Sequence, residues 1–131
     1  MSMLREGLNI EKVFEVKEEH LAKFLASGDV YVLSTPSMIA FMENVSRMLA
    51  EKYLSNEETT VGTKVCVRHL KPAPLGAEIR VKSTLTKIDG RRLTFKVEAC
   101  WKDELIGEGE HERFIVNRDK FSERVKRLST L

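Results

Sequence analysis

The sequence has few of the features that mark secreted, membrane-spanning or metal-binding proteins. It contains two cysteines and three prolines in 131 residues. Cys66 and Cys100 have no metal-type spacing and form no disulfide framework, which indicates two free thiols in a reducing compartment. No apolar run approaches the roughly 20 residues that span a bilayer. The first residues lack the apolar core of a secretory signal, so we expect a cytoplasmic protein.

The sequence also has almost no excess of charge of one sign. The formal net charge is only +2, which is too small to indicate nucleic acid or a membrane surface as a partner. A hydrophobic content of 42% and a charged content of 32% are typical of an ordinary globular protein. We therefore expect one domain over residues 1–131, large enough to bury its own core, with no cofactor and no metal.

The stretch from Tyr31 to Tyr53 is predicted to contain a long central helix. Ser34 or Thr35 can cap its start, because a hydroxyl accepts a hydrogen bond from a first-turn amide, and Pro36 suits that first turn. Glu43 is a single carboxylate among apolar neighbours. Few charges interrupt the run, so the other elements are expected to wrap around this helix. Its apolar residues recur at helical spacing: Met38, Met42, Val45, Leu49 and Tyr53.

Before this helix, the pattern predicts a strand over 8–16 and a short amphipathic helix over 17–26. In that short helix Leu21, Phe24 and Leu25 are expected to face inward, and Ser27-Gly28 should end it. Tyr31 to Leu33 should then lead, extended, into the long helix. A polar connection follows the long helix, and the remaining sequence has the character of strands.

Four strands and a terminal helix are predicted after the long helix. Asp89-Gly90 is typical of a two-residue hairpin, and Asp103-Glu104 of a second turn. The two glycines of the last strand indicate a bulge or a close backbone approach. Long strands joined by tight turns predict an antiparallel meander, and therefore an α+β domain in which a curved sheet wraps around the helix. The strands are expected over 59–70, 77–88, 91–102 and 105–116, and the helix over 117–128.

Alternation along these strands predicts which side chains share a face. In the first of the four, the inward set is expected to include His69. In the next two, the inward sets are almost entirely apolar. The three predicted sets are Val61, Thr63, Val65, Val67 and His69; Ile79, Val81, Ser83 and Leu85; and Leu93, Phe95, Val97, Ala99 and Trp101.

Four segments occur in a fixed order along the chain. They are STPSMIAFMENV (34–45), TTVGTKVCVRHLKPAPLG (59–76), DGRRLTFKVEA (89–99) and IGEGEHERFIV (106–116), and together they cover roughly residues 30–117. In this order they resemble the hot-dog fold thioesterases, most closely the fluoroacetyl-CoA thioesterase-like family. The resemblance implies the hot-dog fold, acyl-CoA thioester hydrolysis, and a homodimer with active sites at the subunit interface.

The resemblance also implies roles for particular residues. Thr35 matches the family's threonine in the S-T-P segment, Glu43 its helix glutamate and His69 its histidine in the R-H-L segment. Gly62 matches the glycine whose backbone amide lies by the substrate carbonyl, and Arg113 the arginine near the pocket. One segment departs from the family pattern. Members selective for a fluorinated acyl group place phenylalanines before S-T-P as a lid, whereas this chain has LASGDVYV, so fluoroacetyl specificity is not carried over.

These residue types suit thioester hydrolysis, which needs a nucleophile or activated water, a proton acceptor and donors for the oxyanion. Each also has a plainer explanation. Glu43 could pair with Arg47 on the helix surface, and its role as a base requires that its carboxylate be buried. Thr35 could be only a helix cap, Gly62 only a bulge, and His69 a core histidine. His111 could line the pocket.

Other functions remain open at this stage. A hot-dog protein can bind acyl-CoA or a small ligand without turning it over, or can serve only as a structural oligomer. A hot-dog hydratase would need an aspartate and a histidine spaced along one loop–helix segment, which this sequence lacks. The basic tail over 118–128 is usually a solvated helix face, although it could lie near the phosphates of coenzyme A.

Overall fold

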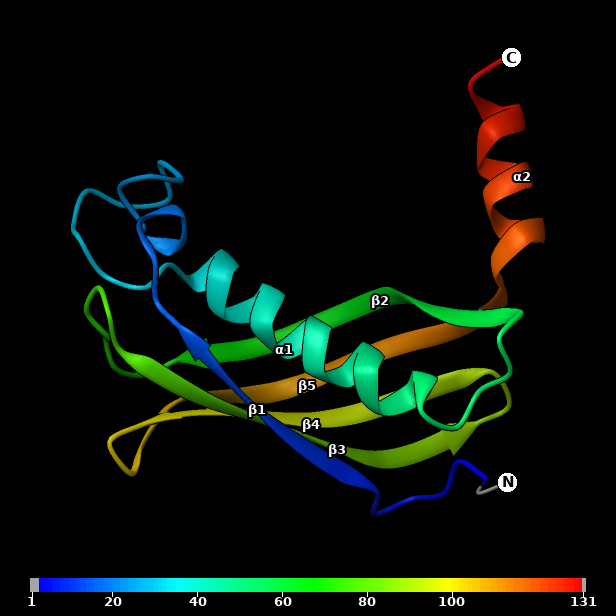
Figure 1. The fold of residues 1–131 in the computed structure, drawn as a ribbon, viewed down its shortest axis with the longest axis horizontal. Coiled ribbons are helices and arrows are strands. Elements are labelled where there is room, and N and C mark those ends of the chain that lie inside the picture. Colours follow the sequence, from blue (N-terminus) through cyan, green and yellow to red (C-terminus); the bar gives the residue numbers. More distant parts are fainter. Residues whose placement is uncertain (1–2, 131) are drawn as a thin grey trace.

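One antiparallel sheet curves around a single long helix, as Figure 1 shows for the computed structural model, which describes residues 3–130. Residues 1, 2 and 131 of the predicted domain lie outside the described residues. The sheet has five strands in the order β1-β3-β4-β5-β2. The predicted α+β fold is confirmed, whereas the predicted meander is right only for β3, β4 and β5, because β2 pairs with β5 instead of β3. The strands are β1 (Asn9–Glu15), β2 (Glu58–His69), β3 (Glu78–Asp89), β4 (Arg92–Trp101) and β5 (Glu104–Asn117).

Helix α1 (Thr35–Glu51) begins where the sequence predicts, and the structure decides between the two predicted caps. Ser34 is the N-cap, and its hydroxyl accepts a hydrogen bond of 3.0 Å from the Ser37 amide. Pro36 lies in the first turn, where its missing N–H is not needed. The suggestion that Thr35 caps the helix is therefore wrong. Because Ser34 caps the helix, the Thr35 hydroxyl is available to another partner.

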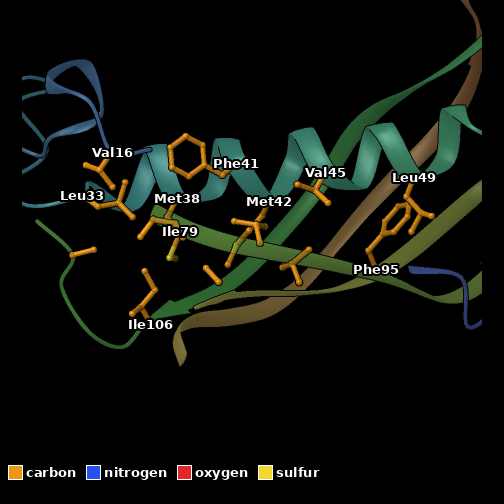
Figure 2. Packing of buried hydrophobic residues seen from close by; sticks show 14 of the residues in the cluster. Val16, Leu33, Met38, Phe41, Met42, Val45, Leu49, Ile79, Phe95 and Ile106 are labelled. Carbon is orange, nitrogen blue, oxygen red and sulfur yellow. The ribbon is translucent and has the colours of Figure 1, made fainter. Parts of the chain in front are cut away.

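The core lies between α1 and the concave face of the sheet (Figure 2). The predicted helix face is buried at Met38, Met42, Val45 and Leu49, whereas Tyr53 lies after the end of α1 and is only partly buried. The alternation predicted for β3 and β4 is confirmed over residues 79–85 and 93–99, where every second side chain is buried, whereas Trp101 at the end of the predicted set is only partly buried. Burying each large side chain contributes about 1.5–3 kcal/mol. The buried strand residues are Ile79, Val81, Ser83 and Leu85 on β3 and Leu93, Phe95, Val97 and Ala99 on β4.

The predicted helix over 17–26 is wrong. Only a 3₁₀ turn, η1 (Glu18–His20), forms there. The amide of Ala22 donates to the Val32 carbonyl at 2.8 Å, and that of Lys23 donates to the Val30 carbonyl at 3.2 Å. These amides therefore pair with the segment that leads into α1 and cannot serve a helix. Leu21 is buried as expected, whereas Phe24 and Leu25 are 67% and 42% exposed.

The alternation predicted for β2 holds for only part of the strand, because β2 contains a bulge. Its pairing with β5 passes from Gly62 opposite Arg113 to Lys64 opposite Glu112, which leaves Thr63 as an extra residue. Residues opposite each other on antiparallel strands share a face. The helix-facing set is therefore Thr60, Gly62, Val65, Val67 and His69, and the inward placement predicted for Val61 and Thr63 is wrong.

Both predicted turns exist, the first one residue later and the second one residue earlier than expected. Asp89 still pairs with Arg92, so the first loop is Gly90-Arg91, with Gly90 at a φ of 61°. The second loop is Lys102-Asp103, where both residues have positive φ. Helix α2 (Arg118–Leu128) is present as predicted, is capped by Asn117 and stands away from the sheet (Figure 1).

Gly107 and Gly109 of β5 mark close approaches to other elements, as predicted. A Cβ on Gly109 would overlap the Cys66 carbonyl oxygen and the Val67 backbone of β2. A Cβ on Gly107 would overlap the end of the Met38 side chain on α1. These two positions let β2, β5 and α1 pack more closely than side chains would allow.

We expect Gly109→Ala to lower the free energy of unfolding by about 2–4 kcal/mol, because the neighbouring backbone of β2 has to shift. Urea denaturation measures this change. Glu110→Ala, an exposed neighbour on the same strand, is the control and should stay within about 0.5 kcal/mol of the parent protein. Equal stabilities of the two variants would contradict the proposed close packing.

Candidate active site

Thr35 and His69 form a hydrogen-bonded pair at one end of α1. Thr35 Oγ1 lies 2.8 Å from His69 Nδ1. Thr35 is the first residue of α1, and His69 is the last residue of β2, on its helix-facing side. The threonine hydroxyl donates to Nδ1 when the imidazole carries its proton on Nε2. This is the arrangement of a hydroxyl beside a base that can take its proton.

The surroundings of His69 favour the neutral imidazole that this arrangement needs. Burial lowers its pKa, and polar contact with the backbone of Lys71 partly opposes the shift. Nε2 is shielded from solvent and makes no hydrogen bond to the described residues. His69 can therefore accept the Thr35 proton near neutral pH.

A cleft of about 350 Å³ opens beside this pair. Thr35 and His69 form part of its wall, together with Lys71 and small or apolar residues of the segment before α1 and of the turn after β2. Glu43 is not part of this wall. The other lining residues are Ala22, Ser27, Gly28, Val30, Val32, Leu33, Ser34, Leu70, Lys71 and Pro72.

Glu43 lies in a second cluster, further along α1. Its Oε2 is 4.0 Å from a terminal nitrogen of Arg113, and a Cβ on Gly62 would lie 2.9 Å from the same oxygen. The alternative of a surface pair with Arg47 is wrong, since Arg47 pairs with Glu51 at 3.1 Å. The Glu43 side chain is 41% exposed, so the burial expected of a base is not reached in the single chain.

Arg113 is held firmly in this second cluster. Its Nε donates to Thr60 Oγ1 at 2.6 Å, one terminal nitrogen donates to the Thr60 carbonyl at 2.9 Å, and the other lies 3.0 Å from His111 Nε2. Burial lowers its pKa, and the Glu43 carboxylate opposes that shift. Thr60 was not singled out from the sequence, and His111 was only a possible pocket residue. Alternation alone places His111 on the same face of β5 as Arg113 and Thr60 on the same face of β2 as Gly62, which was the available signal. The contacts of His111 and Thr60 with Arg113 depend on the register of the two strands.

The two clusters are separate within one chain. Thr35 and Glu43 are eight residues apart on α1, which corresponds to about 12 Å along the helix axis. His69 contacts Thr35, whereas Glu43 contacts Arg113. The structure thus brings together Thr35 with His69, and Glu43 with Gly62 and Arg113. It does not bring all five together.

The part of the chain that the structure describes contains neither a metal site nor a membrane-spanning helix. No group of histidine, cysteine, aspartate or glutamate residues within 3–130 has the arrangement to hold a metal ion. No helix within the same residues is long and apolar enough to cross a membrane.

Comparison with protein families gives a match over residues 16–119 to the family described as fluoroacetyl-CoA-specific thioesterase (FlK). A curated relative, the fluoroacetyl-CoA thioesterase of Streptantibioticus cattleyicolor, is 34% identical over 95 residues. The aligned part covers 72% of this chain and 68% of that relative. The family match over residues 16–119 includes both clusters.

Solved structures agree over almost the whole chain. The structure of the fluoroacetyl-CoA thioesterase FlK is 28% identical, with a TM-score of 0.90, and the alignment covers 96% of this chain and 98% of that one. A hypothetical protein of Thermus thermophilus, described as a thioesterase superfamily member, is 30% identical with a TM-score of 0.90. That alignment covers 99% of this chain and 96% of the other.

We expect the His69 imidazole to titrate below the ordinary histidine pKa of about 6.5, because burial disfavours its charged form. Thr35→Val removes the hydroxyl that stabilises the neutral ring, so the pKa should rise in that variant. NMR titration measures both values. Thr86→Val, an exposed threonine whose hydroxyl donates to the Thr94 carbonyl, is the control. A His69 pKa that is identical in the Thr35 variant would argue against the pair.

Proposed function

The chain belongs to the fluoroacetyl-CoA-specific thioesterase family and is an acyl-CoA thioester hydrolase with the hot-dog fold, and from this premise we propose its substrates and its mechanism. The family, fold and activity predicted from the sequence are confirmed. We propose that the substrates are short or modest acyl-CoA thioesters, which are hydrolysed to the free acid and CoA, and that Thr35, His69 and Glu43 are the catalytic groups.

The observation that carries the mechanism is the 2.8 Å contact between Thr35 Oγ1 and His69 Nδ1. As Oγ1 attacks the thioester carbonyl, its proton passes to Nδ1 and a tetrahedral intermediate forms. The C–S bond then breaks, the CoA sulfur leaves with a proton, and an acyl-threonine results. Water attacks this ester and releases the acid. In the alternative route Thr35 only orients the thioester, and water attacks it directly.

Glu43 has a place in both routes. Its carboxylate can accept a proton from the attacking water, a role that requires contact with that water. The partial exposure of Glu43 leaves room for water or substrate beside it. Gly62 carries no side chain that would block the approach of a carbonyl oxygen, and Arg113 provides positive charge next to the carboxylate. We propose these two as substrate-binding residues that stabilise the developing oxyanion.

We propose that the active protein is a homodimer, because one chain alone keeps its two clusters about 12 Å apart along α1. Among the described residues β2 pairs only with β5, so its outer edge is free. Antiparallel pairing of two β2 strands about Cys66, with Thr63 again left as the extra residue, would place Gly62 of one chain opposite His69 of the other. Each site would then combine Thr35 and His69 from one chain with Glu43 and Gly62 from the second.

The acyl group is not restricted to fluoroacetyl in this proposal. The cleft beside Thr35 is lined by Gly28, Val30 and Val32 from the segment that carries phenylalanines in the selective members. The one aromatic residue of that segment, Tyr31, is 67% exposed and does not line the cleft. A cleft without a bulky lid suits a broader range of short acyl groups.

Glu43→Gln should reduce kcat for acyl-CoA hydrolysis by about 100-fold or more, because it removes the proton acceptor while keeping the shape of the side chain. Thiol release across a panel of acyl-CoA substrates measures the effect. Glu51→Gln makes the same chemical change two turns further along α1 and should leave kcat within about threefold of the parent. Undiminished activity of Glu43→Gln would remove it from the mechanism. Saturable acyl-CoA binding by the parent protein without thiol release would favour a non-catalytic binder.

The shared site makes a separate prediction about mixed dimers. Thr35→Val and Glu43→Gln homodimers should both be nearly inactive. A purified heterodimer, co-expressed with two affinity tags, should recover about half of the parent activity, because one of its two sites contains only native residues. A heterodimer as inactive as both homodimers, or a monomer in light scattering, would contradict the proposed interface.

A further inference from the structure

His111 lies at the centre of the second cluster, and neither its buried position nor its two contacts are explained by core packing. It lies on the helix-facing side of β5 and is only 1% exposed. Nδ1 is 2.8 Å from the Lys64 carbonyl oxygen, and Nε2 is 3.0 Å from a terminal nitrogen of Arg113. Both ring nitrogens are thus used in a buried, fully paired arrangement.

The chemistry of these two partners determines where the imidazole proton lies. A carbonyl oxygen only accepts hydrogen bonds, so Nδ1 carries the proton and donates it to Lys64. A guanidinium only donates, so Nε2 has a free lone pair that accepts from Arg113. His111 is therefore neutral and present as one tautomer. Burial lowers its pKa, the Lys64 carbonyl opposes this shift, and the Arg113 guanidinium adds to it.

One consequence of this arrangement is that the Arg113 guanidinium cannot rotate freely. Thr60 binds two of its nitrogens and His111 binds the third. The terminal nitrogen that donates to His111 is the one that lies 4.0 Å from Glu43 Oε2. The lone pair of His111 therefore determines the direction in which that nitrogen presents its remaining proton to Glu43.

A second consequence concerns the bulge that carries Gly62. The Lys64 carbonyl, which accepts the His111 proton, belongs to the first residue paired with β5 after the extra residue Thr63. A Cβ on Gly62 would lie 3.3 Å from His111 Cε1 and 3.5 Å from Arg113. The imidazole is thus packed against the inner side of the bulge and hydrogen-bonded to its end. Gly62 and Arg113 are held by the same ring.

We propose that His111 is a positioning residue of the thioesterase site, which as a neutral imidazole holds Arg113 and the Gly62 bulge in place against Glu43. This rests on the proposed roles of Gly62, Arg113 and Glu43 in hydrolysis. His111 does not touch the reacting atoms. It acts through Arg113 and Gly62, which are proposed to contact the substrate.

The role also gives the site a sensitivity to acid. A proton on Nε2 would remove the acceptor of Arg113 and place two cations in contact. The charged groups near the ring are Arg113 and Glu112 on β5 and Glu43 on α1, and both carboxylates favour the protonated form. Because the folded-state pKa of His111 is lowered, the neutral ring and the arrangement that it holds persist at neutral pH and are lost as the pH falls through that pKa.

The test compares three variants of the full-length protein by steady-state acyl-CoA hydrolysis and by thermal unfolding. His111→Phe fills the space without either hydrogen bond. His111→Gln returns an acceptor within reach of Arg113. Phe95→Leu, a fully buried neighbour whose ring centroid is 6.3 Å from that of His111, is the control for core disruption.

We expect His111→Phe to lower kcat by about tenfold or more with KM within about threefold, and Phe95→Leu to keep kcat within about threefold despite its lower stability. His111→Gln should recover part of the loss, and the fall of its activity in acid should follow the titration of His69 alone. The proposal is overturned if His111→Phe retains the parent kcat, or if His111→Phe and Phe95→Leu lose kcat equally.

A measurement without substrate tests the arrangement itself. Heteronuclear NMR of the imidazole nitrogens should identify a neutral His111 with its proton on Nδ1 at neutral pH. A charged ring, or a proton on Nε2, would overturn the proposal even if the variants lose activity. A parent protein that is inactive on every acyl-CoA overturns the proposed substrates and mechanism, whereas an active parent with an unaffected His111→Phe variant overturns only the positioning role.

Discussion

The pairing of β2 with β5 determines where the polar groups that the sheet contributes to the site lie. At Gly109 the two strands approach so closely that no side chain fits between them. A few residues along, the extra residue Thr63 shifts the alternation of β2 by one position. Gly62 and His69 are seven residues apart, an odd number that in a regular strand would send them to opposite faces. Because of the bulge, both face α1, and each meets a different part of the same helix.

Much of the fold was predictable because local patterns and the final packing agree. The apolar spacing of α1 and the alternation of β3 and β4 each identify one buried face, and those faces meet in the core. The prediction failed over 17–26, where a helix-like spacing of apolar residues was outweighed by hydrogen bonds to residues 30–33. Such pairing depends on the return of the chain through Gly28, which the spacing of apolar residues does not reveal.

The site was predictable to a smaller extent. The resemblance identified Thr35, Glu43 and His69, but only the structure shows which residues they contact. Ser34 and Thr35 are chemically similar at the start of a helix, and only the structure distinguishes the cap from the partner of His69. The support that Thr60 and His111 provide to Arg113 depends on the register of two strands and on the bulge. Neither can be read from residue types alone.

Helix α1 is continuous and carries a residue of each cluster, so it fixes the distance between the two clusters of one chain. A substitution that tilts or shifts this helix moves Thr35 and Glu43 together. The loop over 21–33, in contrast, borders the cleft but does not set that spacing. New acyl preferences can therefore arise through exchanges in the loop while the spacing of Thr35 and Glu43 along α1 is preserved. The protein separates the part that can change during evolution from the part that has to stay constant.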